Sequence, residues 1–67
     1  MTATEIRRQL QELHTERALA SIAGLGGNLA YSADLDQEIA STTQAYVGAA
    51  VTEIATLRAQ LSGPQQG

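Results

Sequence analysis

The chain has 67 residues and a formal net charge of −3, with four arginines, no lysine and no cysteine. So short a chain buries a modest share of its surface, which limits it to one domain with a thin core. The negative charge offers no attraction to phosphate backbones or anionic lipid, so we expect neither nucleic acid nor a membrane among its partners. Without disulfides, oligomerisation is the remaining way for a small scaffold to gain stability.

A capping-box pattern begins the first predicted helix. Thr2 is followed three residues later by Glu5, which favours a helix from about residue 3. Apolar residues then follow at spacings of four and three, and this heptad-like seam predicts a helix over about residues 3–24. The seam consists of Ile6, Leu10, Leu13, Arg17 and Ala20. Because Arg17 stands where an apolar side chain is expected, it should pair with Asp36 or Glu38, or extend to solvent at the rim.

The glycine-rich segment 24–28 predicts a turn, because glycine adopts the left-handed conformation that ends a helix. It lacks the preceding strand and the Lys-Ser/Thr ending of a phosphate-binding loop, so a connector between helices is favoured over a phosphate site. A helix-turn-helix is disfavoured as well, because the chain has no basic cluster to hold DNA. Either Asn28 or Ser32 can cap the next helix, and we prefer Asn28.

The longest helical pattern covers about residues 29–62, which contain no proline. Such a helix is roughly 50 Å long, more than the first helix can cover. Its apolar stripe recurs every eleven residues, which is typical of straight packing rather than of a long left-handed supercoil. The hydroxyl-rich segment 41–43 and Gly48 are its weakest positions and leave a kink open. After the helix we expect a loose tail over 63–67.

Together these patterns predict an all-α helical hairpin with a short first and a long second helix. Because the second helix carries apolar residues that the first cannot cover, we expect hairpins to assemble into a helical bundle, as a dimer or tetramer. The residues expected at the interface are Ile6, Leu10, Leu13, Arg17, Leu35, Ile39, Tyr46, Val47, Ala50, Ile54, Leu57 and Leu61. The alternative is that this stripe docks on another protein as a helix-in-groove ligand.

The sequence does not provide the residues that a catalytic centre needs. His14 is the only imidazole, and Glu12 and Glu16 lie two positions to either side of it, so the three side chains project to different faces of the helix. A carboxylate-bridged metal pair would need Glu at position 11, which is Gln. We predict no enzyme activity, no metal and no cofactor. His14 is interpreted as a surface or interface residue, which leaves a pH-sensitive assembly open.

Two stretches of the second helix, YSADLDQEI (31–39) and AYVGAAVTEIATLR (45–58), resemble small helical-hairpin proteins of actinobacteria and their phages. The resemblance covers most of the chain and implies no catalytic or binding residues. It implies a phage or prophage setting, in which such proteins serve as virion parts, assembly factors or binders of host proteins. The N-terminus lacks the order of a signal peptide and no apolar run approaches a bilayer span, so we expect a cytoplasmic protein or a virion component.

These expectations define the predicted function. The chain is predicted to be a non-enzymatic structural or assembly component that acts as a homo-oligomer. The alternative is a small protein-binding regulator that docks the same apolar stripe on a host or partner protein.

Overall fold

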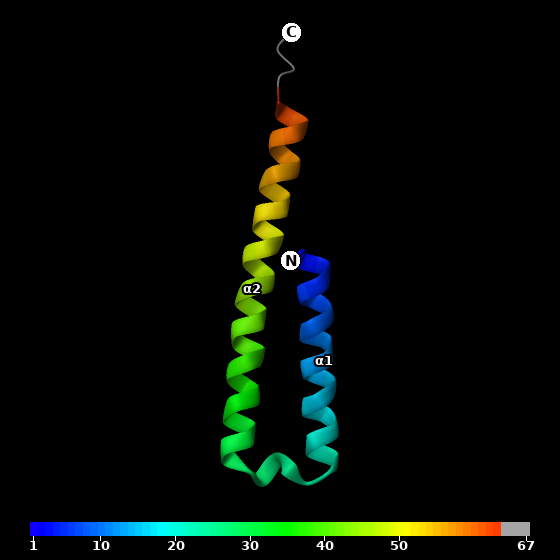
Figure 1. The fold of residues 1–67 in the computed structure, drawn as a ribbon, viewed down its shortest axis with the longest axis vertical. Coiled ribbons are helices and arrows are strands. Elements are labelled where there is room, and N and C mark those ends of the chain that lie inside the picture. Colours follow the sequence, from blue (N-terminus) through cyan, green and yellow to red (C-terminus); the bar gives the residue numbers. More distant parts are fainter. Residues whose placement is uncertain (64–67) are drawn as a thin grey trace.

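The structure, a computed structural model, describes residues 1–63 as two antiparallel helices joined by a short turn (Figure 1). Helix α1 spans Ala3–Ile22, the 3-10 turn η1 spans Leu25–Gly27, and helix α2 spans Leu29–Ser62. The predicted all-α hairpin with a short first and a long second helix is confirmed. Helix α1 ends two residues before the expected position 24, and α2 has the expected range. Apart from Gly63, the expected tail lies outside the described residues.

Both helices begin at a residue whose side chain caps the first turn. Thr2 Oγ1 accepts a hydrogen bond from the Glu5 N–H (3.2 Å), and Glu5 Oε1 accepts one from the Thr2 N–H (2.7 Å), which completes the capping box. Asn28 Oδ1 accepts a hydrogen bond from the Tyr31 N–H (3.0 Å), so Asn28 caps α2 as preferred. These side chains satisfy N–H groups that have no partner within the helix.

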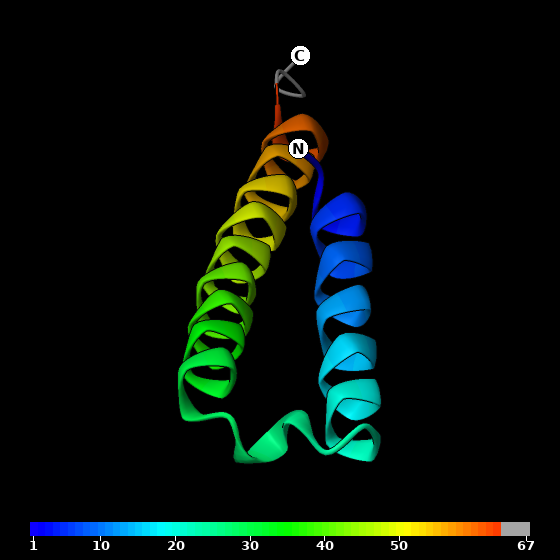
Figure 2. The ribbon, with the colours of Figure 1, turned by 60° about the horizontal axis from the view of Figure 1, so that its bottom comes forward.

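Helix α1 ends because Gly24 adopts a left-handed conformation with φ of 81°. The Ala23 N–H donates to the Leu19 carbonyl (2.9 Å), and the Gly24 N–H donates to the Ser21 carbonyl (3.2 Å). Glycine takes this conformation without the strain that a Cβ atom would cause. The chain reverses direction here, and η1 carries it across to the start of α2 (Figure 2).

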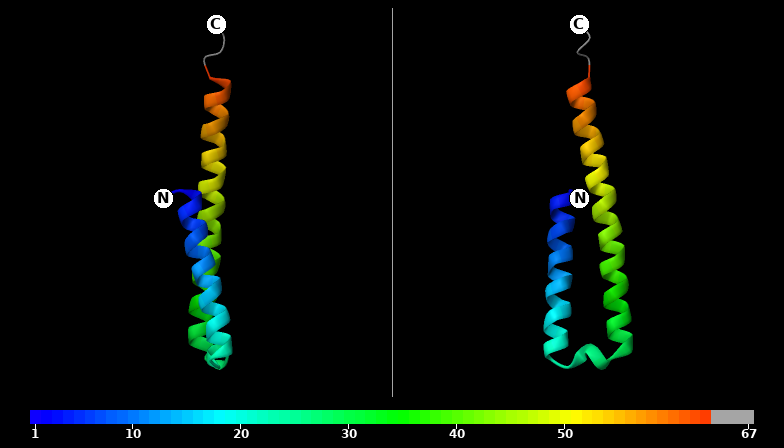
Figure 3. Two further views of the ribbon diagram at one scale, coloured as in Figure 1. Left: turned by 90° about the vertical axis from the view of Figure 1, so that its right-hand side faces the viewer. Right: turned by 180° about the vertical axis from the view of Figure 1, so that it is seen from behind.

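Helix α2 is continuous through residues 41–48, where the sequence allows a kink. The Thr43 hydroxyl donates to the Ile39 carbonyl (2.7 Å), and the Thr52 hydroxyl donates to the Gly48 carbonyl (2.9 Å). These hydroxyls therefore bond to carbonyls one turn earlier in the same helix, and the backbone of α2 stays helical at these residues. Two side views show no sharp bend in α2 (Figure 3). Its 34 residues give a length of about 51 Å.

Helix α2 extends beyond the N-terminal end of α1, as Figure 1 shows. The Ala3 N–H donates to Glu53 Oε2 at 2.6 Å, so the side chain of Glu53 reaches the first turn of α1. The following residues of α2, 54–62, continue without α1 beside them, and we call this segment the overhang. The short helix therefore covers one part of the long helix and leaves the other part uncovered.

The core of the described chain is a single seam between the two helices. Its buried side chains are Ile6, Ala20, Leu35 and Ile39, and the side chains of Leu10, Leu13 and Tyr46 are half-buried. Each belongs either to the predicted seam of α1 or to the stripe of α2 that faces it. Three large buried side chains form a small core for a chain of this length, since each contributes only about 1.5–3 kcal/mol.

Candidate interaction surface

Arg17 pairs with Asp36 across the seam. Its Nη2 atom lies 3.0 Å from Asp36 Oδ1. Of the two partners expected for Arg17, Asp36 and Glu38, the ion pair is therefore formed with Asp36. The two side chains remain 56% and 53% exposed. Solvent screens such a pair, and it contributes at most about 1 kcal/mol to stability. The second carboxylate oxygen of Asp36 stays open to a further partner.

Glu53 has a role that the sequence reasoning did not predict. Its carboxylate accepts the Ala3 N–H at 2.6 Å, at the N-terminal end of α1. The N–H groups of a first helical turn carry a partial positive charge, so a carboxylate placed there stabilises the helix. Its distance from the turn gave no direct indication, because Ala3 lies 19 residues before the end of α1 whereas Glu53 lies 24 residues after the start of α2.

Hydrogen bonds shift the pKa of two side chains in the hairpin. The Tyr31 hydroxyl donates to Glu16 Oε2 at 2.8 Å. This bond, with some desolvation and the nearby negative charge, raises the pKa of the Tyr31 phenol, because a phenolate would lose the bond and face a carboxylate. The backbone and side-chain hydrogen bonds from Thr2 lower the pKa of Glu5. Both shifts follow from contacts that hold α1 and α2 in place.

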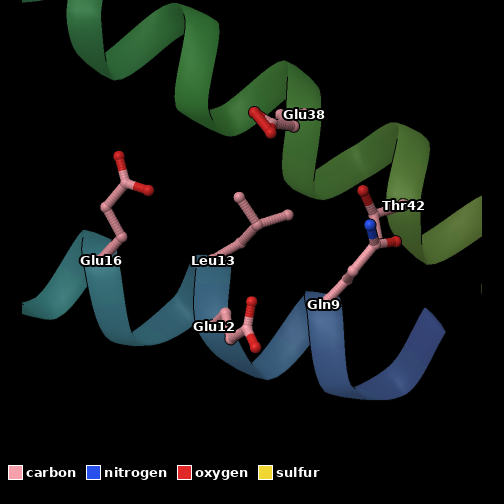
Figure 4. A pocket seen from close by; sticks show the side chains of 6 residues that line it. All are labelled: Gln9, Glu12, Leu13, Glu16, Glu38 and Thr42. Atoms are coloured by element: carbon pink, nitrogen blue, oxygen red, sulfur yellow. The ribbon is translucent and has the colours of Figure 1, made fainter. Parts of the chain in front are cut away.

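An open hollow lies along one side of the seam (Figure 4). Its volume is about 210 Å³, and it is lined by Gln9, Glu12, Leu13, Glu16, Glu38 and Thr42. Leu13 points from α1 toward α2, and glutamates of both helices surround it. The described residues contain no group of three or more His, Asp or Glu side chains placed to hold a metal ion. We call this the acidic side of the hairpin.

The other side of α2 carries exposed apolar residues and is called the lateral face here. Most of its positions directly follow one that lies against α1, so the face is turned about 100° around the helix from the seam. It consists of Ala33, Asp36, Ala40, Thr43, Val47, Val51, Ile54, Arg58 and Leu61, all of them exposed. The large aliphatic members Val47, Val51, Ile54 and Leu61 are 53%, 60%, 57% and 64% exposed.

Leu57 continues the line of the seam past the end of α1. It follows Leu35 and Tyr46 at intervals of eleven residues and therefore points in nearly the same direction from the helix axis. Leu35 is buried by α1, whereas Leu57 lies in the overhang and is 57% exposed. The repeat therefore extends beyond the helix that covers its first members.

Further exposed apolar side chains surround the turn. They are Leu19, Ile22, Leu25 and Leu29, and they lie off the seam. Ile22 and Leu29 are the most exposed of them, at 83% and 82%. Exposed apolar side chains therefore occur near both ends of the hairpin.

The structure divides the predicted interface residues into two groups. Those used within the hairpin itself are Ile6, Leu10, Leu13, Arg17, Leu35, Ile39, Tyr46 and Ala50. Those left exposed are Val47, Ile54, Leu57 and Leu61. The prediction omitted Val51, Asp36 and Arg58, although their helical spacing places them on the same side of α2 as Val47 and Ile54. His14 is exposed on α1.

Within the described residues, neither helix combines the length and the apolar character of a membrane span. Comparison with protein-family models, with curated proteins and with solved structures finds no match. The resemblance to actinobacterial and phage hairpin proteins therefore stays a prediction.

Proposed function

We propose that this chain is a non-enzymatic structural or assembly component that binds further copies of itself through α2. The observation that supports this most directly is the lateral face, on which large aliphatic side chains remain more than half exposed. Several exposed aliphatic side chains grouped on one face of a helix are typical of a protein interaction site. The overhang adds to it, because α2 is longer than its own α1 can cover.

A second copy is the partner that the size of the chain favours. The hairpin buries few large side chains and has no cysteine, so assembly supplies burial that the single chain lacks. Covering the exposed parts of Val47, Val51, Ile54 and Leu57 stabilises by about 4–5 kcal/mol per copy, at about 2 kcal/mol per fully buried side chain. Association itself costs about 4–15 kcal/mol, so a stable dimer also needs the remaining contacts of the face.

The competing function is that of a ligand for a different protein. Such a ligand would be monomeric and poorly helical when pure, because its ordering depends on the partner. The capped ends of both helices and the seam between them favour a chain that is already ordered by itself. No match among known proteins supports a phage setting, so the proposal is limited to self-assembly.

Light scattering over a range of protein concentrations, with circular dichroism on the same samples, tests the proposal. The variant Ile54→Asp places a charge on the lateral face. Its matched control is Thr56→Asp, which lies two residues further along and therefore about 200° around the helix. A helical oligomer is expected for the wild type and for Thr56→Asp, and a monomer is expected for Ile54→Asp.

Two results would overturn the proposal. One is a wild-type protein that stays monomeric at every concentration, which would direct the search to a different partner protein. The other is an oligomer that both variants weaken equally, because the lateral face would then have no special part in assembly.

A further inference from the structure

We infer that two copies pair through their lateral faces in an antiparallel, two-fold arrangement centred on Val47. This inference rests on the proposed self-assembly and specifies the register of the two α2 helices. Its basis is the spacing of the face, which is the same in both directions from Val47. Toward the C-terminus the positions follow at steps of four, three, four and three residues, and toward the N-terminus the steps are identical.

The symmetric spacing matters for a pair of helices that is related by a two-fold axis. In an antiparallel pair related by such an axis, residues at equal distances from it meet across the interface. Val47 then meets Val47 of the second copy, Thr43 meets Val51, and Ala40 meets Ile54. Each of these positions is exposed in the hairpin, so the pairing does not compete with the seam.

Side-chain sizes are complementary in this register. The small Ala40 lies opposite the large Ile54, and the small Ala33 lies opposite the large Leu61. Each layer therefore has a similar total volume, and the two helices can stay at a constant separation. A parallel pairing would place Ile54 against Ile54 and Ala40 against Ala40, which pushes the helices apart at one level and leaves a gap at the other.

The charges of the face are complementary as well. Asp36 lies opposite Arg58 of the second copy, and the two-fold axis creates this pair twice. Asp36 already binds Arg17 through Oδ1 (3.0 Å), and its side chain is still 53% exposed, so its other oxygen can accept from Arg58. A parallel pairing would instead bring Arg58 beside Arg58 and Asp36 beside Asp36, where like charges repel.

The area of contact also favours the full face over the overhang alone. The face extends over residues 33–61, about 42 Å at 1.5 Å per residue, and is about 10 Å wide. Two copies then cover about 800 Å² in projection, which is below the roughly 1,200 Å² of typical stable interfaces, so contacts of each overhang with the second copy's α1 have to add to it. Contact between the overhangs alone, about 13 Å long, would cover less than a third of this area.

The arrangement gives the overhang a cover that its own hairpin lacks. Residues 54–62 of one copy lie level with residues 32–40 of the other, where α1 of that copy is present. A two-fold axis perpendicular to the paired α2 helices places both α1 helices on the same side of the pair. Leu57, which points in the direction of the seam, therefore faces the second copy's α1, and the four helices form a bundle.

Single cysteines in this cysteine-free chain test the register. Under mild oxidation, Val47→Cys is expected to form a covalent dimer, because residue 47 meets itself on the axis. Ile54→Cys is the control, since its two copies lie about 21 Å apart in this arrangement, too far for a disulfide. A short bismaleimide applied to the same variants captures sulfurs that are close but outside disulfide geometry. Light scattering on the reduced samples reports whether each variant still assembles.

The outcomes separate the register from the self-assembly. Covalent dimers of Val47→Cys without those of Ile54→Cys support the inference. Cross-linking of both variants would indicate a parallel pair and overturn the register, while self-assembly would stand. Reduced dimers that cross-link at neither position would place the interface elsewhere and also overturn it. A wild-type protein that stays monomeric would contradict the proposed function itself.

A size exchange gives a second, independent readout. Ala40→Ile alone crowds the layer with Ile54, and Ile54→Ala alone empties it, so each is expected to weaken dimerisation by about tenfold or more. The double variant exchanges the two sizes and should restore most of the affinity. Restoration is not expected in a parallel pair, in which positions 40 and 54 never meet. Losses in the double variant that equal the sum of both single losses would contradict the inference.

Discussion

Replacing isoleucine by alanine at two positions of α2 separates the stability of the hairpin from that of its assembly. Ile39 is 9% exposed in the seam, whereas Ile54 is 57% exposed on the lateral face. The two positions share the same side chain, helix and substitution. They differ in which element covers them, and this difference decides where each substitution is felt.

The magnitudes follow from this burial. Ile39→Ala removes a side chain from a closed seam and should cost the hairpin about 2–5 kcal/mol. Ile54→Ala should cost the isolated hairpin about 1 kcal/mol or less, because less than half of the side chain is covered and alanine is the better helix former. In a dimer, the substitution also removes the burial of the part of each Ile54 side chain that is exposed in the hairpin. Over two copies this amounts to about 2.5 kcal/mol, or dimerisation weaker by roughly fiftyfold.

Thermal unfolding followed by circular dichroism, over roughly a hundredfold range of protein concentration, measures both effects. At the lowest concentration Ile39→Ala should unfold well before the wild type, and Ile54→Ala should unfold close to it. At the highest concentration the wild type should gain stability by mass action, and Ile54→Ala should gain much less. A wild-type midpoint independent of concentration would refute the assembly. Equal losses for both variants at the lowest concentration would refute the assignment of the seam.

Three further predictions concern the polar contacts of the hairpin. Arg17→Leu should change the free energy of unfolding by less than about 1 kcal/mol, because its ion pair is half-exposed, and a larger loss in urea unfolding would contradict this. The raised pKa of Tyr31 should fall toward 10.0 in Glu16→Ala, as measured by ultraviolet titration in a background in which Tyr46→Phe removes the other tyrosine. The stability that the Tyr31–Glu16 hydrogen bond contributes should be lost as the pH rises through the folded-state pKa of Tyr31. The lowered pKa of Glu5 contributes stability above its unfolded value, and this stability is lost as the pH falls through the folded value. Glu5→Gln should therefore unfold with a weaker pH dependence than the wild type below pH 4.5, and an unchanged dependence would argue against the shift.

The hairpin and its caps were predictable because they depend on local chemistry. Thr2 and Asn28 cap the helices through bonds to residues three positions away, and Gly24 turns the chain through its own conformation. The pair between Arg17 and Asp36 was also within reach, since antiparallel arms joined by a short turn determine which residues lie level. Local signals of this kind depend little on the rest of the fold.

The division of the apolar stripe was not predictable in the same way. Hydrophobic spacing identifies residues on one broad side of a helix, but Tyr46 and Val47 are neighbours that point about 100° apart. Which of them the hairpin covers depends on the direction from which α1 approaches, and where cover ends depends on the position of Ala3 beside Glu53. Both are properties of the tertiary fold. The sequence reasoning therefore grouped residues of the seam with residues of the lateral face.

The difference between α1 and α2 has a physical consequence for the proposed bundle. Helix α2 has two largely apolar faces about a quarter turn apart, which is what a helix needs to contact two neighbours in a four-helix bundle. Helix α1 has one such face over its first four turns, where the exposed positions Arg7, Gln11 and Thr15 are polar. In the proposed two-fold arrangement the α2 helices therefore join the copies, and both α1 helices cover the same side of the pair. A long α2 and a short α1 suit this division, because the overhang of one copy lies beside the covered part of the other.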